Sequence, residues 1–150
     1  MYHSIVKRNL RRAFQQLNDG DYDSILAQFG PQFEHVFPGN HSLAGRRDTP
    51  TSNVAWYKRL ATIFPDLRFE INNIVVNGWP WDTVATAEWQ DSFTLRDGRK
   101  GNNQGVHVFR LRWGKVTSLH IYTDTQKLSN YCQELSAQGV ADATAVPIVD

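Results

Sequence analysis

The feature that most constrains this chain is a glycine-containing turn between two long strand-like segments. The segments NNQGVHVFRLRW and VTSLHIYTD are separated only by Gly114 and Lys115. Two-residue loops that begin with glycine are typical of the type II′ turn of a β-hairpin. Such a turn sets the register of both strands, so we predict that Trp113 lies opposite Val116.

This register sorts the hairpin into two faces, because side chains alternate across a strand. One face is predicted to gather an imidazole, a phenol and a carboxylate at its open end, in the pairs Phe109–His120, His107–Tyr122 and Gly105–Asp124. The other face is predicted to carry a β-branched and aliphatic stripe that includes Val106, Val108, Leu119 and Ile121. Since both faces are partly apolar, we expect both to be covered.

Composition narrows the class of protein. A chain of 150 residues, with 41% hydrophobic and 21% charged residues, indicates one globular domain with a real core. The net charge is +1 and the basic residues are scattered along the sequence, so we expect no nucleic-acid partner. The single cysteine, Cys132, excludes an intrachain disulfide and fits a reducing compartment. Without a signal-peptide pattern or a long apolar run, we expect a cytoplasmic protein with no membrane partner.

The order of the elements predicts an α+β fold. Apolar residues at helical spacing indicate helices over residues 4–18, 22–28, 51–64 and 124–136. A brief strand is expected at 32–37, and four strands joined by short connections at 67–77, 83–95, 102–113 and 116–123. We expect this long sheet, with a β-bulge at Asn72-Asn73, to curl around the N-terminal helices as a cone with an internal pocket.

The domain boundary follows from the same pattern. Residues 1–136 are predicted to form a single domain, and the segment 137–150 lacks periodicity. We expect this C-terminal tail to be an arm or a frayed end.

Several chemically useful side chains are predicted to line the pocket. The RDGRKG connection places Trp89 opposite His107 and Asp91 opposite Gly105. The expected substrate-binding residues are therefore His35, Trp56, Tyr57, Trp89, Asp91, Asn103 and Phe109. In an apolar mouth, Asp124 would act as general acid or base, with His107 as its partner and Tyr122 as an oxyanion donor.

Plainer interpretations stand beside this one. A buried His–Tyr–Asp group is often only a satisfied polar network, and Asp124 lies directly before TQKL, where it would serve as a helix N-cap. We interpret Trp79 and Trp81 of the GWPWD corner as packing residues. The histidines lack metal-ligand spacing, and no nucleotide-binding or nucleophile-elbow motif occurs, so we expect neither metal nor cofactor.

Four segments resemble the SnoaL-like branch of the NTF2-like superfamily, within residues 4–135: NDGDYDSILAQF, HVFPGNHSLAGRRDT, LRFEINNIVVNG and GVHVFRLRWGKVTSLHIYTDTQKL. The resemblance implies an α+β cone and a homodimer packed through the outer sheet face, which would use the stripe of Val106, Val108, Leu119 and Ile121. Family members include polyketide cyclases, ketosteroid isomerases and limonene-epoxide hydrolases. In the cyclases a late carboxylate and a pocket histidine serve in acid/base chemistry, and Asp124 and His107 occupy such positions.

The chain also departs from two members of that family. Where the epoxide hydrolases show an Arg-Asp pair, this chain has His120-Ile121. The early strand offers His35 in place of the aspartate base of the steroid isomerases.

Two hypotheses follow. The first is a cofactor-independent acid/base enzyme of the isomerase or cyclase type, acting on a small hydrophobic oxygenated molecule such as a polyketide or terpenoid. The second is a non-catalytic module for small-ligand binding or dimerisation. A fully packed cone would favour the second hypothesis.

Overall fold

The computed structural model describes all 150 residues, and its elements follow the predicted order. The helices are α1 (Tyr2–Asn18), α2 (Tyr22–Leu26), α3 (Pro50–Ile63) and α4 (Thr125–Ala137), followed by a short 3₁₀ helix at Ala141–Thr144. The strands are β1 (Phe29–Phe37), β2 (Gly45–Arg47), β3 (Arg68–Trp79), β4 (Asp82–Thr94), β5 (Lys100–Arg112) and β6 (Lys115–Thr123). The short strand β2 falls where the sequence pattern predicted a loop.

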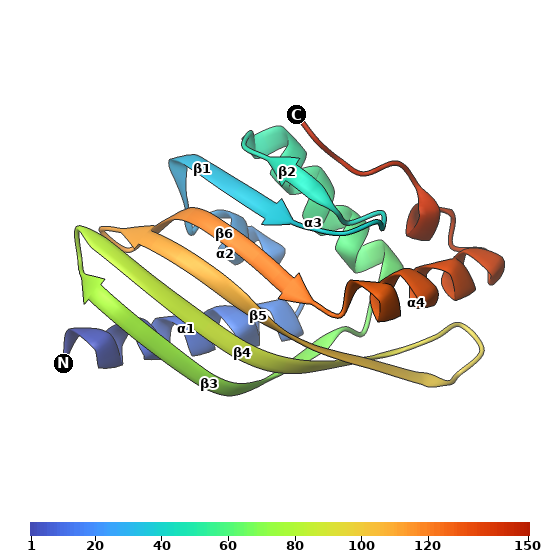
Figure 1. Ribbon diagram of the computed structural model, residues 1–150, viewed down its shortest axis with the longest axis horizontal. Helices are drawn as coiled ribbons and strands as arrows, with labels where there is room; N and C mark the ends of the chain where they lie inside the picture. The colour runs from blue at the N-terminus through green and yellow to red at the C-terminus, as the bar shows by residue number, and fades with distance from the viewer.

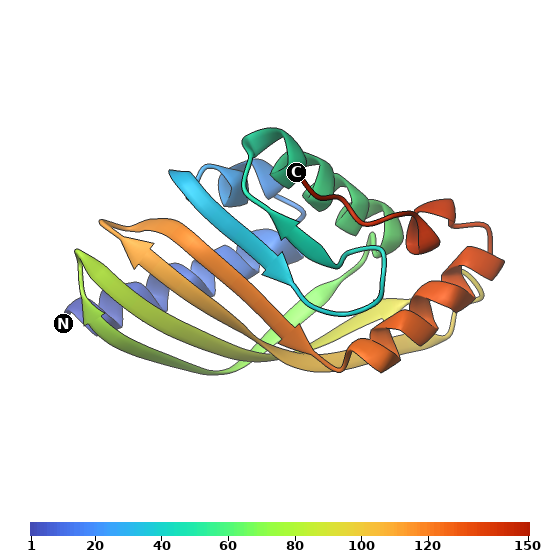
Figure 2. The same ribbon diagram turned by 45° about the horizontal axis from the view of Figure 1, so that its top comes forward.

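The six strands form one curved, mixed sheet in the order β2-β1-β6-β5-β4-β3. All neighbours are antiparallel except β1 and β6, which are parallel. Helices α1, α2 and α3 lie on the concave side, and α4 lies across one end of the cone (Figure 1; Figure 2). The predicted α+β cone is confirmed. The bulge expected in β3 is also present, as a register shift between Ile71 and Asn73.

The predicted register of the β5–β6 hairpin is wrong. Arg112 pairs with Lys115, so the two turn residues are Trp113 and Gly114, both with positive φ (51° and 77°). Glycine therefore occupies the second central position of the turn, the arrangement of a type I′ loop. Leu111 consequently lies opposite Val116 instead of Ser118.

A β-bulge then reverses the faces of β6. Leu111 pairs with Val116 but Arg110 pairs with Ser118, so Thr117 is an extra residue on β6. Beyond the bulge, every β6 side chain points to the face opposite to the predicted one, because an inserted residue shifts the alternation by one.

The consequence for the predicted faces is direct. Leu119 and Ile121, predicted on the outer face, are buried in the core with 3% and 4% exposure. Tyr122, predicted inside, is 45% exposed on the outer face, where it contacts His120. On β5, Val106 and Val108 face outward as predicted.

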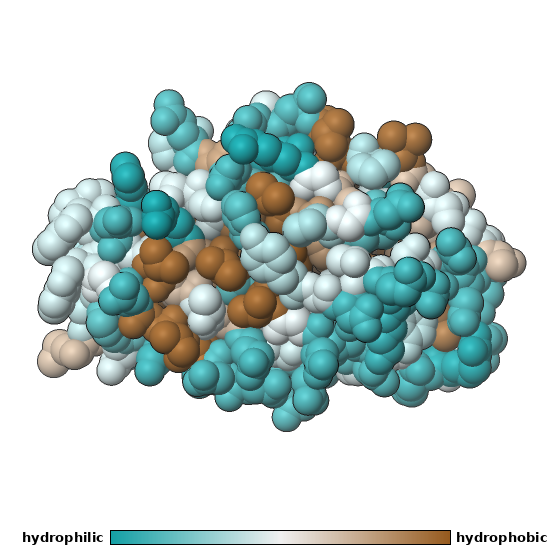
Figure 3. Space-filling model, in the orientation of Figure 1, coloured by the Kyte–Doolittle hydropathy of each residue, from teal (hydrophilic) through white to brown (hydrophobic).

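The outer face of the sheet carries an apolar area, seen as brown atoms gathered over its left half (Figure 3). The register places Val36, Val108 and Val75 in one row across the sheet, and Val75 is 54% exposed. Dimerisation through this face stays a prediction, and it rests now on Val106 and Val108 without Leu119 or Ile121. None of the helices has the length and apolar composition needed to cross a bilayer.

The C-terminal tail is a packed arm. The carbonyl of Ile148 accepts a hydrogen bond from Arg47 (2.7 Å), and that of Val146 accepts one from Arg59 (2.7 Å). Asp150 accepts a hydrogen bond from Thr49, the N-cap of α3 (3.0 Å). These contacts fix residues 145–150 against strand β2 and the start of α3 (Figure 1).

Candidate active site

A cavity of about 60 Å³ lies inside the cone, between the sheet, α3 and α4. Fourteen of its eighteen lining residues are hydrophobic, so it is an apolar space with few polar groups. Six of the predicted site residues line it: Trp56, Tyr57, Trp89, Asp91, Asn103 and His107. The predicted pairing of β4 with β5 is displaced by two residues, Trp89 facing Gly105 and Asp91 facing Asn103. A displacement of two keeps each side chain on its predicted face.

Asp91 is the only carboxylate in the cavity wall. Its Oδ1 atom is buried and has no hydrogen-bond partner. Burial raises the pKa of Asp91 to about 6, against the smaller opposing effects of the Asn103 backbone N–H and the charge of Lys127. A desolvated carboxylate with a pKa near neutrality is ionised at pH 7 and is a stronger base than an ordinary aspartate.

Asp91 can also be reached from outside. A polar depression of about 340 Å³ adjoins the cavity, and its walls hold carboxamide and charged groups: Gln90, Asp91, Asn102, Asn103, Gln104, Asp124 and Lys127. Since Asp91 and Asn103 belong to both walls, a proton removed inside the cavity has a polar way out to water.

His107 is held as a neutral hydrogen-bond donor. The indole Nε1–H of Trp89 donates to His107 Nδ1 (2.8 Å). Because an indole nitrogen can only donate, Nδ1 must be unprotonated and the ring proton lies on Nε2. Burial lowers the pKa of His107 to about 3, which keeps the imidazole uncharged at neutral pH. Nε2–H has no partner in the protein, so a ligand oxygen can accept from it.

The two groups act at different places. His107 pairs with Ala87 on β4, four residues before Asp91. At about 3.4 Å per residue, their rows are roughly 13 Å apart along the strands. His107 and Asp91 would therefore contact opposite ends of a ligand.

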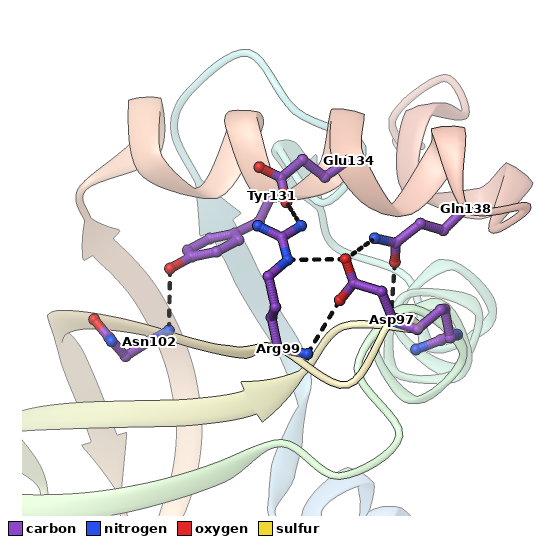
Figure 4. A network of polar contacts seen from close by, with 7 residues as sticks. Asp97, Arg99, Asn102, Tyr131, Glu134 and Gln138 are labelled. Carbon is purple, nitrogen blue, oxygen red and sulfur yellow. Dashed lines mark hydrogen bonds and ion pairs between the residues drawn. The ribbon is translucent and has the colours of Figure 1, made fainter.

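Helix α4 closes the mouth of the cavity with Leu128 and Tyr131. Polar contacts tie this helix to the β4–β5 turn (Figure 4). Arg99 forms ion pairs with Glu134 (2.7 Å) and Asp97 (2.8 Å), and Gln138 donates to Asp97 (3.1 Å). The backbone N–H of Asn102 donates to the Tyr131 hydroxyl at 3.4 Å. These pairs are exposed to solvent, so each contributes little to stability and together they position α4 against the turn.

His35 lies outside the cavity and has a different environment. It is fully buried, and its Nδ1 accepts a hydrogen bond from Arg47 Nε (3.0 Å). Burial, together with the charge of Arg47, lowers the pKa of His35 well below its usual range. Arg47 is also fully buried, 5.3 Å from the ring of Trp56, and burial lowers its pKa to about 10. Nothing in the Arg46-Arg47 pair of the sequence indicates that one of these two arginines is buried.

Three further predicted residues lie away from the main cavity. Tyr122 is on the outer sheet face, and Asp124 is an exposed residue whose carboxylate caps α4 by accepting from Lys127 N (3.0 Å). The proposed grouping of His107, Tyr122 and Asp124 therefore does not exist, because the bulge in β6 separates them. Phe109 lines a smaller hollow of about 30 Å³ beside His107.

Sequence reasoning missed several wall residues. Tyr131 and Leu128 come from α4, and Leu17 comes from the end of α1. Their spacing on amphipathic helices indicates only that they face inward, so the sequence holds no signal that separates a cavity wall from a packed core.

The architecture is that of an NTF2-like protein: a curved sheet folded over helices, with a cavity at the centre. A protein of this class from Burkholderia pseudomallei, of unknown function, has a TM-score of 0.73 at 16% identity, with 83% of this chain and 95% of that chain covered. A candidate isomerase from Bacillus subtilis has a TM-score of 0.73 at 13% identity, covering 89% and 96%. AclR, a candidate hydroxylase from Streptomyces galilaeus, has a TM-score of 0.66 at 15% identity, with 94% of this chain and 87% of that chain covered.

The family assignment comes from the sequence itself. The SnoaL-like domain family matches residues 10–119, which is most of the chain, and the protein belongs to that family. A search of curated proteins found no match. The structural neighbours carry different activity labels at low identity, so they establish the fold and leave the reaction to be argued from the site.

Proposed function

We propose that this SnoaL-like protein is a cofactor-independent enzyme that transfers a proton on a small, largely apolar, oxygenated molecule. Asp91 is the general base and replaces Asp124 in that role. The observation that carries the proposal is the ionisable carboxylate of Asp91 in an apolar cavity, with one buried oxygen free of protein partners. Desolvation brings its pKa to about 6, close to the value that a base needs at neutral pH.

The reaction follows from the two polar ends of the site. Asp91 removes a proton from an acidic C–H group, and the electron pair moves through a conjugated system to a carbonyl oxygen. His107 Nε2–H donates to that oxygen and stabilises its developing charge. Return of the proton to another carbon completes an isomerisation, and attack of the carbanion on a second carbonyl completes an aldol-type cyclisation.

The shape of the site limits the substrate. The cavity is far smaller than the roughly 300–1,000 Å³ of a typical ligand pocket. A substrate that reaches from Asp91 to His107 is therefore long, narrow and flat, and partly exposed wall residues such as Leu17, Leu67 and Tyr131 move when it enters. The aromatic walls of Trp56, Trp89 and Phe69 suit an unsaturated ring system of the polyketide or terpenoid type.

The experiment is hydrogen–deuterium exchange on a panel of conjugated ketones that runs from single rings to linear fused-ring aromatic ketones, followed by NMR in D₂O. We expect the protein to accelerate exchange at a carbon conjugated to the carbonyl. Asp91→Asn keeps the shape but removes the base, and should slow exchange by about 10²–10⁴-fold. Glu88→Gln is the matched control, since its side chain lies on the same strand but on the outer, exposed face.

The alternative is a ligand-binding module without catalysis, which the small size of the cavity favours. It predicts that compounds perturb the NMR signals of His107 while no compound exchanges faster with the protein than without it. Unchanged exchange in the Asp91→Asn variant would remove the base assignment.

A further inference from the structure

A second surface, away from the cavity, presents three exposed tryptophans. Trp79, Trp81 and Trp113 are 57%, 58% and 72% exposed. They lie in the β3–β4 and β5–β6 turns, which meet the start of α1 at the end of the molecule opposite to α4 (Figure 1). As expected, Trp79 and Trp81 pack against each other in this corner, yet more than half of each side chain stays exposed. We call these three tryptophans, with Tyr2, the aromatic tip.

The rings of the aromatic tip form a row. Ring centres are 6.4 Å apart between Tyr2 and Trp79, between Trp79 and Trp81, and between Trp81 and Trp113. The ring planes of the first two pairs differ by only 22° and 21°, so these rings are nearly parallel. None of the three indole N–H groups has a partner in the protein. The row therefore presents ring edges and free N–H donors to its surroundings.

The aromatic tip is built into the fold. The backbone N–H of Trp113 donates to the carbonyl of Pro80 (2.6 Å), which joins the two turns. His3 Nε2 bonds the carbonyl of Gly78 (2.8 Å), which joins α1 to the same corner. Trp113 is the only non-glycine residue with positive φ (51°), a conformation that is unfavourable for a bulky side chain and favours Gly or Asn. Strain retained at an exposed aromatic residue points to a binding role.

Charge is divided unevenly between this part of the chain and the rest. Helix α1 and the tip of the β5–β6 hairpin carry seven of the sixteen Lys and Arg residues, all exposed: Lys7, Arg8, Arg11, Arg12, Arg110, Arg112 and Lys115. The nearest acidic residue in these turns is Asp82, which lies 3.7 Å from Arg110. The remainder of the chain holds nine basic residues against fourteen acidic ones. The aromatic tip is thus flanked by the basic part of an otherwise acidic molecule.

We propose that the aromatic tip binds the surface of an anionic lipid membrane, as a peripheral contact. Tryptophan favours the membrane interface, where its ring leaves water while its N–H bonds to head groups. Lys and Arg beside such rings add attraction to anionic lipids. An apolar groove of about 300 Å³ opens next to Trp113, lined by Ile5, Pro80 and Leu111, and accommodates part of an acyl chain.

A single-stranded nucleic acid is the other anionic partner that binds tryptophan and arginine, but it stacks on free ring faces. Here the rings of Tyr2, Trp79 and Trp81 lie beside one another in a row, and the apolar groove next to Trp113 suits an acyl chain better than a nucleotide. The membrane proposal departs from the expectation that this protein has no membrane partner. It does not depend on the proposed catalytic function.

The test is co-sedimentation of the full chain with phosphatidylcholine vesicles, with and without phosphatidylserine. We expect binding to the anionic vesicles, weak binding to the neutral ones, and loss of binding at high salt. Brominated lipids should quench the fluorescence of the tip, because the two other tryptophans, Trp56 and Trp89, are buried. The double variant Trp81→Ala/Trp113→Gly should bind anionic vesicles at least about tenfold more weakly.

Two controls keep the outcome clear. Val75→Ser removes an exposed apolar side chain from the outer sheet face and should leave vesicle binding unchanged. Trp113→Gly relieves the positive φ and should raise Tm by about 2–4 °C, so its loss of binding is not a loss of folding. Failure of the wild-type chain to bind anionic vesicles, or equal binding by the double variant, overturns the proposal. Retention on a single-stranded oligonucleotide instead of vesicles overturns it in favour of a nucleic-acid partner.

Discussion

Two histidines on opposite faces of the sheet have similar partners and different chemistry. On the inner face, His107 accepts from the indole of Trp89, and Asp91 lies in the same cavity. On the outer face, His120 lies between the Tyr122 hydroxyl (3.1 Å) and the Glu34 carboxylate (2.9 Å). Both groups combine an imidazole, an aromatic donor and a carboxylate.

Burial accounts for the different pKa shifts of the two groups. Inside, desolvation raises the pKa of Asp91 and lowers that of His107, and the two groups do not pair. Outside, the hydrogen bond from His120 and the nearby charge of Arg46 lower the pKa of Glu34. Water and ion pairing thus make the outer carboxylate a weaker base, while exclusion of water makes the inner one a stronger base. The same residue types therefore give a raised carboxylate pKa only on the concave face.

The largest expected effect on stability follows removal of the buried imidazole of His107, compared with removal of His120. His107 is 7% exposed and packs 5.1 Å from the ring of Phe14. His107→Ala leaves a cavity and an unpaired Trp89 N–H, so it should cost about 3 kcal/mol of unfolding free energy. His120→Ala breaks a partly exposed pair and should cost about 1 kcal/mol or less. Urea unfolding of both variants at pH 7 checks this, and equal losses would contradict the comparison.

The next effect is the pH dependence of Asp91→Asn. The folded-state pKa of Asp91, about 6, lies above its ordinary value of 3.8, so its ionisation opposes folding. Wild-type stability from this group is highest below pH 4 and falls as pH rises through 6. The full pKa shift of Asp91 corresponds to roughly 3 kcal/mol of unfolding free energy. Access of water to the carboxylate reduces this to about 1–2 kcal/mol.

Asp91→Asn should therefore be about 1–2 kcal/mol more stable than the wild type at pH 7.5, and this gain should fade towards pH 4. Glu34→Gln is the matched outer variant and should change stability in the opposite direction. Because the pKa of Glu34 is lowered in the folded state, its carboxylate stabilises the fold at pH values above the ordinary pKa of glutamate. This stabilisation is lost as the pH falls. Chemical denaturation at several pH values measures the unfolding free energy of both variants. A higher unfolding free energy for Glu34→Gln than for the wild type at neutral pH would contradict the expected difference between the two faces.

The smallest effect is spectroscopic. The ¹⁵N signals of His107 should show a neutral ring with the proton on Nε2, unchanged between pH 8 and pH 5, because its pKa is about 3. Trp89→Phe removes the donor to Nδ1 and should allow the other tautomer to appear. A protonated His107 ring at pH 5 would contradict the neutral-donor role.

Much of the fold could be predicted from local patterns. The helices, the order of the long strands and the bulge at Asn73 follow from hydrophobic spacing and chain breaks. The inward faces of β4 and β5 were also predicted, since the pairing error of two residues preserves the alternation. Trp89, Asp91, Asn103 and His107 therefore line one cavity as expected.

The predicted grouping of His107, Tyr122 and Asp124 depended on the register of the β5–β6 hairpin, and that register was wrong. One extra residue at Thr117 turned Tyr122 outward and Ile121 inward. The alternation of Leu119 and Ile121 with more polar neighbours favoured this orientation, but the turn register assumed from Gly114-Lys115 pointed the other way. Asp124 is the N-cap of α4, as the simpler interpretation of the sequence predicted. A two-residue glycine turn permits more than one register, and the choice depends on neighbouring strands.

The sequence by itself determined the family, the α+β class and the inner side chains of β4 and β5, because alternation and helical spacing are local properties. Only the tertiary structure decided which carboxylate lies in the apolar cavity. A pKa depends on the water removed around a group, and the packing of α3, α4 and the sheet desolvates Asp91 while leaving Asp124 in solvent. At the opposite end of the molecule, the contact between the β3–β4 and β5–β6 turns brought three tryptophans together, which no single segment of the sequence encodes.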